Sequence, residues 1–187
     1  MQPFTEKVFT NRLLLRRILR EDLETLWRWS RSPGSYGDFL SPEHLVKDDL
    51  LQRYMAGMFW SEKEKLFLIE KRGGAALGTI HYWLSSGRQD TATVAVKIAE
   101  PAERNKGYGT EAQKFLLIYL FDKIKVQHVE MYTDLDNLAQ QRCLKKLGFS
   151  LIETLTYDDS GIRRTGNLYR ISRPVYLQEA IYRYHYE

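Results

Sequence analysis

The chain has 187 residues, 43% hydrophobic and 28% charged, and a net charge of +4. This composition is ordinary for a globular protein, and the length predicts one domain over residues 1–187, with an aromatic tail at 175–187. The charge is too small and scattered to indicate a nucleic-acid binder, and no apolar run reaches the ~18 residues of a membrane span. Because Cys143 is the single cysteine and no secretory signal opens the chain, we expect a cytoplasmic protein.

The first third of the chain predicts one strand and two helices. Residues 13–15 form an apolar strand, and a helix follows over residues 21–29, where acidic residues favour its start. Residues 30–42 contain two prolines and two glycines and therefore predict a loop. A second helix is expected from residue 43 to residue 59, with its apolar residues on one face.

The rest of the chain predicts six strands and three helices. The strands are expected at residues 66–71, 77–84, 92–98, 129–133, 151–157 and 167–172. The helices are expected at residues 107–124, 137–147 and, as a short packed helix in the tail, 176–186. Glycines between neighbouring strands predict hairpin turns, and Gly148 occupies the usual position after a helix end.

The junction between residues 98 and 110 carries the strongest chemical signal. A β-branched strand precedes the basic loop Arg104-Asn105-Lys106-Gly107-Tyr108-Gly109-Thr110, and an amphipathic helix follows it. Glycines allow dihedrals closed to other residues, and the free N–H groups and dipole of a helix start favour an anion. The order predicts a cradle for a phosphate or diphosphate, although a plain strand–helix turn with solvated basic side chains explains the spacing alone equally well.

Two motifs together resemble one enzyme superfamily. The segment from Arg104 to Gly109 resembles the Arg/Gln-x-x-Gly-x-Gly/Ala loop of the GNAT acetyltransferases. The segment from Asn137 to Phe149 resembles their Asn…Leu-x-Lys-x-Gly-Phe segment, and the resemblance extends from Arg12 to about residue 173. It is strongest for the branch that includes ribosomal-protein N-acetyltransferases, which also contains enzymes acting on antibiotics and small amines.

The resemblance implies an α/β (α+β) fold with a mixed, mostly antiparallel sheet and helices on both faces. In this fold the strands at 92–98 and 129–133 splay apart and hold acetyl-CoA, the cosubstrate. The N–H groups of Val96 and Ile98 are expected to pair with its pantetheine arm. The diphosphate is expected on the loop residues Arg104, Asn105, Lys106, Gly107, Tyr108, Gly109 and Thr110. Asn137 matches a pantetheine-binding residue, and a helix N-cap explains it equally well.

Two catalytic groups common among relatives are missing. The strand before the loop has no Glu at Thr93, Val94 or Ala95, and Leu144 replaces the usual tyrosine acid. The remaining candidates for proton transfer are His81, Tyr36, Asp38 and Asp134, each of which packing or solvation also explains. No cluster has metal-ligand spacing, so we expect no metal.

Three functional hypotheses follow. The first is direct transfer of the acetyl group of acetyl-CoA to a primary amine, either a protein N-terminus or a cationic small molecule such as an aminoglycoside or polyamine. The alternative is a non-catalytic acyl-CoA-binding or sensor protein of the same fold, which Leu144 favours. The third is a partner-binding protein that forms a homodimer through the aromatic tail.

Overall fold

The computed structural model describes residues 6–159 and 161–183. The chain forms two compact units. Unit 1 comprises the residues up to Tyr82 together with Val96–Gln113, and unit 2 comprises Trp83–Ala95 together with the residues from Lys114 onward. Strands β4 (Ala76–Ser85) and β5 (Arg88–Ile98) contribute residues to both. The prediction of a single domain stays a prediction.

The described residues form eight strands, whose hydrogen-bonded order is β1-β2-β3-β4-β5-β6-β8-β7. In unit 1, β1 (Lys7–Phe9), β2 (Leu13–Arg17) and β3 (Glu64–Lys71) pair antiparallel. Leu13 and Leu15 are fully buried because alternate residues of a strand share a face. Strand β1 is an element that the sequence pattern did not predict.

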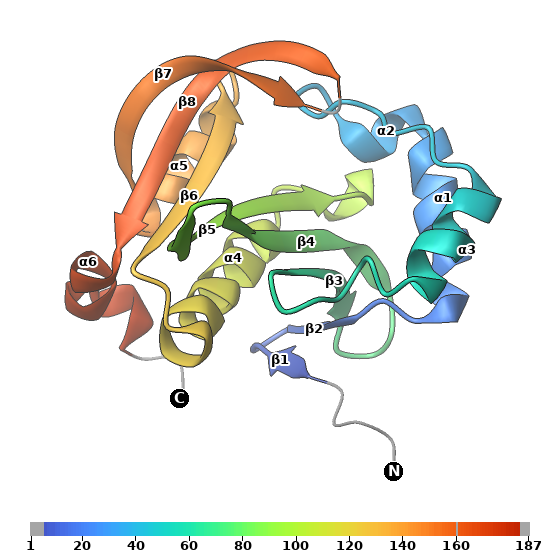
Figure 1. Ribbon diagram of the computed structural model, residues 1–187, viewed down its shortest axis with the longest axis horizontal. Coiled ribbons are helices and arrows are strands. Elements are labelled where there is room, and N and C mark those ends of the chain that lie inside the picture. Colours follow the sequence, from blue (N-terminus) through green and yellow to red (C-terminus); the bar gives the residue numbers. More distant parts are fainter. Residues whose placement is uncertain (1–5, 160, 184–187) are drawn as a thin grey trace. The chain divides into compact units, whose positions relative to one another are not determined.

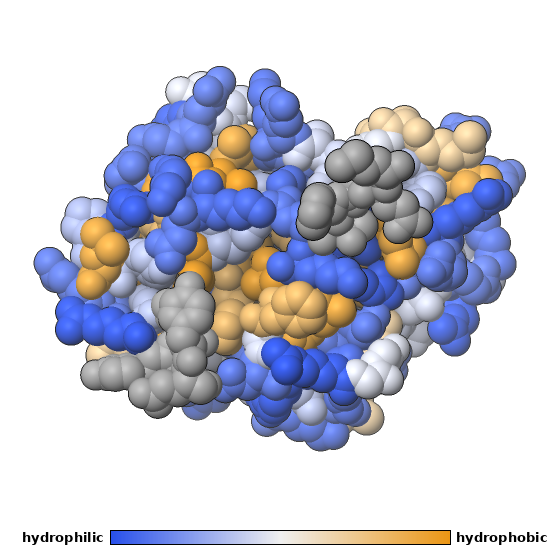
Figure 2. All heavy atoms as spheres, turned by 90° about the horizontal axis from the view of Figure 1, so that it is seen from below, coloured by the Kyte–Doolittle hydropathy of each residue, from blue (hydrophilic) through white to orange (hydrophobic). Residues whose placement is uncertain are grey.

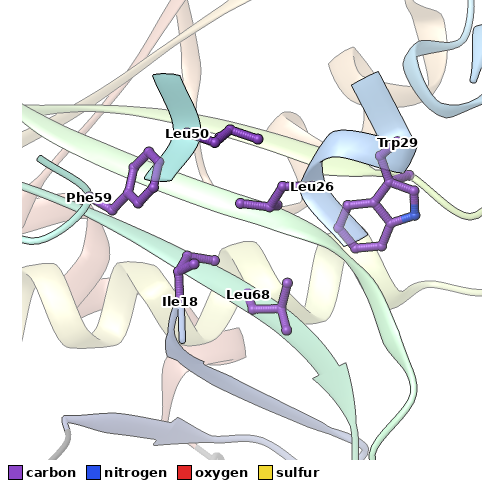
Figure 3. Packing of buried hydrophobic residues seen from close by; sticks show 7 residues of the cluster. Ile18, Leu26, Trp29, Leu50, Phe59 and Leu68 are labelled. Carbon is purple, nitrogen blue, oxygen red and sulfur yellow. The ribbon is translucent and has the colours of Figure 1, made fainter. Parts of the chain in front are cut away.

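Three helices of unit 1 lie close to one another in Figure 1: α1 (Leu23–Arg31), α2 (Pro33–Tyr36) and α3 (Lys47–Met55). Figure 3 shows how α1 and α3 pack, with Leu26, Trp29 and Leu50 pointing toward Ile18 and Leu68. The predicted helix 43–59 is shorter because His44 (φ 46°) and Gly57 (φ 71°) take left-handed conformations that an α-helix cannot include. Helix α2 lies within the predicted loop.

Unit 2 is built around three long strands. Strand β6 (His128–Asp134) pairs antiparallel with β8 (Ile162–Ser172), which pairs antiparallel with β7 (Ser150–Asp159). The first part of β5 pairs with β6 in parallel, with Thr91, Ala92 and Thr93 opposite His128, Val129 and Glu130. Helix α5 (Leu138–Lys146) follows β6. Together with unit 1, these pairings confirm the prediction of a mixed, mostly antiparallel sheet.

The long helix predicted at 107–124 is α-helical in its first part and π-helical at its end. Helix α4 (Tyr108–Ile118) continues as a π-helical turn (Tyr119–Ile124), and Lys125 (φ 67°) ends it in a left-handed conformation. The sequence did not reveal this change because the apolar residues keep recurring through the turn.

The aromatic tail packs onto unit 2. It forms α6 (Arg173–Gln178) and a 3₁₀ turn (Ala180–Tyr182), and Tyr184 and Tyr186 lie outside the described residues. Tyr176 stacks on Phe121 with ring centroids 4.5 Å apart, and the Tyr182 hydroxyl donates to the Leu147 carbonyl at 2.6 Å. These two rings are therefore used for packing within the chain.

The face shown in Figure 2 is largely hydrophilic, with hydrophobic residues in patches between the hydrophilic ones. Among the described helices, none is long and apolar enough to cross a membrane.

Candidate functional site

The loop between β5 and α4 presents its main chain to solvent. Asn105 (φ 61°) and Gly107 (φ 82°) take left-handed conformations, which turn successive N–H groups toward one side. Within the described residues, five consecutive N–H groups have no hydrogen-bond partner: those of Asn105, Lys106, Gly107, Tyr108 and Gly109. The first three of these residues are exposed. The loop therefore offers a row of free donors at the positive end of α4.

These donors fit a diphosphate. Backbone N–H groups at a helix start bind phosphate oxygens without any side-chain movement. A Cβ on Gly109 would meet nothing closer than Ile98 Cγ1 at 3.7 Å, so the first turn of α4 is open on this side. Thr110 is half-buried in the same turn. The predicted contacts of residues 104–110 with the diphosphate stay predictions, and the free donors support them.

Basic side chains surround the loop. Lys71 and Lys106 both bind the Glu103 carboxylate, at 2.7 and 3.1 Å, and the Lys71 bond is the main reason that the pKa of Glu103 falls below its usual value. Arg12 lies 4.5 Å above the Tyr108 ring and donates to the Lys106 carbonyl at 3.1 Å. Arg12 also pairs with Glu111 at 2.6 Å, so three cations face two carboxylates beside the loop, a small excess of positive charge that favours a polyanionic ligand.

Arg104 has a structural role. Its Nε donates to the Ile98 carbonyl at 2.9 Å, and its Nη2 donates to the Gly34 carbonyl at 2.6 Å. A Cβ on Gly37 would lie 3.2 Å from Nη1, so Arg104 also packs against this glycine. Arg104 therefore ties the end of β5 to the segment around α2, in addition to the predicted role of adding charge at the diphosphate.

The strand that leads into the loop is held very close to β4. A Cβ on Gly78 would lie 1.9 Å from the Lys97 carbonyl oxygen, a separation that no side chain permits. The N–H groups of Ala99 and Glu100 both donate to the Leu77 carbonyl, at 2.8 and 3.1 Å. This pairing fixes the end of β5, where Val96 and Ile98 are predicted to bind pantetheine through their N–H groups. Those two contacts stay predictions.

The structure brings two of the predicted catalytic candidates, Tyr36 and His81, into one group with Glu43 and Lys97, which we call the polar cluster. The Tyr36 hydroxyl donates to Glu43 Oε2 at 3.3 Å. Burial, with a smaller contribution from Glu43, raises the pKa of Tyr36 to about 12. Lys97 Nζ lies 4.2 Å from the centre of the Tyr36 ring and 4.0 Å from Glu43 Oε2.

His81 joins the polar cluster from β4. Its Nε2 lies 3.7 Å from Glu64 Oε2. Burial lowers the pKa of His81, and the nearby carboxylates of Glu64 and Glu43 oppose this effect only partly. The imidazole is therefore mainly neutral near pH 7, as a proton acceptor must be.

Sequence reasoning missed Glu43 and Lys97. Lys97 gave one signal, since it is the single charged residue in the apolar run from Val94 to Ile98. Glu43 gave a weak one, since with Asp38, Asp48 and Asp49 it makes this stretch acidic, which favours a cationic acceptor, although acidic residues are also common near helix starts.

The other two catalytic candidates lie apart from the polar cluster. Asp38 is exposed and makes no hydrogen bond or ion pair with the described residues. Asp134, in unit 2, accepts from the Asp136 N–H at 3.0 Å and lies 3.6 Å from Arg164. Their catalytic roles stay predictions.

The second motif, in unit 2, has a clear structural function. Asn137 Oδ1 accepts from the Gln140 N–H at 3.1 Å, which confirms the predicted N-cap of α5. Its contact with pantetheine stays a prediction. Leu144 is fully buried, so the position of the missing tyrosine acid is part of the core. No group of three or more His, Cys, Asp or Glu side chains in residues 6–159 and 161–183 is placed to hold a metal ion.

Comparison with known proteins identifies the family. Residues 12–150 match the model of the acetyltransferase (GNAT) domain. No curated protein matches the chain. Enzymes of this family use acetyl-CoA, so the predictions of an acetyltransferase and of its cosubstrate are confirmed at the level of the family.

Several solved structures share the fold at low sequence identity. A Vibrio cholerae protein provisionally named a ribosomal-protein-serine acetyltransferase is 18% identical, with a TM-score of 0.70 over 92% of this chain and 99% of that chain. The spermidine N-acetyltransferase from Vibrio cholerae, in complex with CoA and spermine, is 18% identical, with a TM-score of 0.75 over 88% and 98%.

The aminoglycoside acetyltransferase AAC(6')-Ib, in complex with paromomycin and acetyl-CoA, is 18% identical, with a TM-score of 0.76 over 90% and 97%. At these identities the neighbours establish the fold, and the match over residues 12–150 establishes the family. The chain belongs to the family of acetyltransferase (GNAT) domains.

Proposed function

We propose that the protein transfers the acetyl group of acetyl-CoA directly to a primary amine, without a covalent enzyme intermediate. The observation that supports this most is the row of free N–H groups from Asn105 to Gly109 at the start of α4. It is the arrangement that a CoA diphosphate requires, and it lies on a chain of the acetyltransferase family.

The number of donors is sufficient for useful affinity. A hydrogen bond to a charged group contributes roughly 1.5–3 kcal/mol. Three or four such bonds support micromolar binding, about −8 kcal/mol, after the cost of ordering the ligand. The pantetheine arm would add contacts along Val96 and Ile98.

The acceptor must lose a proton before it attacks the thioester. At pH 7, deprotonation costs roughly 4.6 kcal/mol for a lysine-like amine of pKa ~10.4, and about 1 kcal/mol for a protein α-amine of pKa ~7.7–8.0. A protein N-terminus therefore demands less of the enzyme than a polyamine or an aminoglycoside. Both kinds of primary amine belong to the proposal, because the structural neighbours include enzymes named for spermidine and for aminoglycosides.

The experiment is turnover with acetyl-CoA across three acceptor panels, read as release of free thiol. The panels are peptides with free N-termini, polyamines and aminoglycosides. We expect saturable thiol release and a mass increase of one acetyl group on at least one acceptor. If calorimetry shows saturable CoA binding while no acceptor is acetylated, the proposal is wrong.

That result would favour a second candidate, a non-catalytic acyl-CoA-binding or sensor protein. The burial of Leu144 at the usual position of the tyrosine acid supports it. For either function, a reducing cytoplasm is the compartment that we propose, since the chain has one cysteine and therefore forms no internal disulfide.

A further inference from the structure

Arg12, in the turn between β1 and β2, contacts three consecutive residues of the loop before α4. Its Nη1 donates to the Lys106 carbonyl at 3.1 Å, and its Nη2 would lie 3.4 Å from a Cβ on Gly107. Its guanidinium lies 4.5 Å from the centre of the Tyr108 ring. All four residues belong to unit 1. One side chain therefore touches the part of the loop that carries free N–H groups.

The Glu111 carboxylate, in the first turn of α4, fixes the position of Arg12. Its Oε2 accepts from Arg12 Nε at 2.6 Å, and its Oε1 accepts from the Arg12 backbone N–H at 2.8 Å. The hydroxyl of the buried Thr10 also donates to Oε1, at 2.5 Å. Burial alone would raise the pKa of Glu111, but the hydrogen bonds from Thr10 and Arg12 outweigh burial and lower it. The carboxylate is therefore ionised at neutral pH, and it binds the guanidinium through a strong, charge-assisted pair.

Two carbonyl groups of the loop are bound within the protein. The Lys106 carbonyl accepts from Arg12, and the Gly107 carbonyl accepts from the Glu111 N–H at 3.0 Å. A peptide group is planar and trans, so its C=O and its N–H point in opposite directions. The N–H groups of Gly107 and Tyr108 belong to these same two peptide groups. They therefore point away from the donors that hold the carbonyls.

The peptide group between Lys106 and Gly107 needs such a bond to keep its orientation. Gly107 has no Cβ to restrict its backbone, and the residue before Lys106, Asn105, is also in a left-handed conformation. A charged donor on the Lys106 carbonyl holds the peptide group against rotation. It also polarises the group, which makes the Gly107 N–H a stronger donor.

We propose that Arg12 is a positioning residue for acetyl-CoA: it holds the Lys106 carbonyl and so turns the Gly107 N–H toward the diphosphate. Glu111 holds Arg12 in place for this role. The inference rests on the proposed binding of acetyl-CoA at the loop. It goes further by giving a turn at the start of the chain control over the affinity for the cosubstrate.

The deciding variants are R12M and R12K, with R72M as the matched control. Arg72 is also an exposed arginine of unit 1, and its N–H donates to the Arg12 carbonyl at 2.9 Å. Its guanidinium lies 5.9 Å from the centre of the Phe9 ring, so R72M removes the same charge nearby but no described contact with the loop. R12K keeps the charge, but lysine lacks the fork of donors that bridges Glu111 and the Lys106 carbonyl.

Three ligands separate positioning from direct contact with a phosphate. Acetyl-CoA carries the diphosphate and a ribose phosphate, acetyl-dephospho-CoA keeps only the diphosphate, and S-acetylpantetheine has neither. We expect calorimetry to show that R12M and R12K bind the first two ligands equally more weakly, by roughly 10-fold. Their affinity for S-acetylpantetheine should stay at the wild-type value, which also shows that the variants are folded. R72M should bind all three ligands as the wild type does.

Two further readouts test the role of Glu111 and the step that is affected. E111Q keeps an acceptor oxygen but loses the charge that holds Nε, so acetyl-CoA should bind roughly 3-fold more weakly. Combining E111Q with R12M should add no further loss, because both residues act through one contact. With an acceptor that the wild type acetylates, R12M should raise the KM for acetyl-CoA rather than lower kcat.

Each alternative predicts a different result. If the loss in R12M disappears with acetyl-dephospho-CoA, Arg12 contacts the ribose phosphate directly, and the inference is wrong. It is also wrong if R12K binds as the wild type does, if R72M loses as much affinity as R12M, or if S-acetylpantetheine is weakened equally. If the wild type binds acetyl-CoA but acetylates no amine, the proposed function fails and the inference stands. If the wild type does not bind acetyl-CoA, both fail.

Discussion

Two regions of unit 1 prepare for their proposed ligands in opposite ways. The loop from Asn105 to Gly109 uses main chain: its N–H groups are free and exposed, while neighbouring side chains such as Arg104 and Lys106 are bonded within the protein. The polar cluster uses side chains from four separate segments; those of Tyr36 and Lys97 are largely buried, whereas the side chain of Glu43 is 45% exposed. Ligand binding by the loop should therefore be sensitive to substitutions that change its backbone conformation. The properties of the polar cluster should be sensitive to substitutions that replace the polar or charged group of a side chain.

The largest effect is expected where the two regions share a strand. G78A adds a Cβ to residue 78. In the present backbone this Cβ would lie 1.9 Å from the Lys97 carbonyl oxygen, which is far too close. Strand β5 must then shift, and we expect the free energy of unfolding to fall by about 3 kcal/mol. Urea denaturation measures this, with T79A on the same strand as the control. A wild-type midpoint for G78A would show that β4 and β5 can separate at no cost.

An intermediate effect is expected for Arg104. R104M removes two hydrogen bonds from a charged group, to the carbonyls of Ile98 and Gly34. The loss of about 1.5–3 kcal/mol should appear as lower stability and as roughly 10-fold weaker acetyl-CoA binding. K106M is the matched variant, because Lys106 is 51% exposed and pairs only with Glu103 in the described structure. The affinity of K106M for acetyl-CoA should change less than threefold. If R104M and K106M lose the same affinity, the positive charge of the side chains, and not the hydrogen bonds of Arg104, determines binding at the loop.

A smaller free-energy cost is expected for a change in the backbone of the loop itself. G107A forces alanine into a conformation at φ 82°, which costs about 1–2 kcal/mol and should weaken acetyl-CoA binding by about 5- to 30-fold. G161A is the matched control, since Gly161 has the same φ of 82° in the β7–β8 hairpin. Calorimetry should show weaker binding for G107A alone. If G107A binds as the wild type does, the main-chain conformation of the loop is not what holds the ligand.

The same contrast explains what the sequence could predict. The loop is local: its glycines and the start of α4 are adjacent in the chain, so the pattern indicated both its shape and its ligand. The polar cluster depends on α2, the segment before α3, β4 and β5 meeting in space. Tyr36 and His81 could be named as candidates, but Glu43 could not be paired with Lys97 before the fold was known.

Element boundaries show the same limit. The predicted helix at 43–59 was too long, because His44 and Gly57 take left-handed conformations that lie outside an α-helix; Gly57 was a local signal for the helix end that the prediction did not use. The π-helical turn after Ile118 keeps the apolar spacing of the preceding helix, so no local signal marked it. The strands other than β1 were predicted, because runs of apolar and β-branched residues such as those buried in β3 and β5 mark a strand directly in the sequence, whereas β1 is only three residues long.

The central claim is that the main chain from Asn105 to Gly109 binds the diphosphate of acetyl-CoA. Calorimetry with acetyl-CoA and with S-acetylpantetheine, which lacks the diphosphate, tests it most directly. Acetyl-CoA should bind with micromolar affinity, and S-acetylpantetheine should bind about 100-fold more weakly or worse, because it makes none of the three or four charged hydrogen bonds. Equal affinity for the two ligands, or no heat with acetyl-CoA, would contradict the claim.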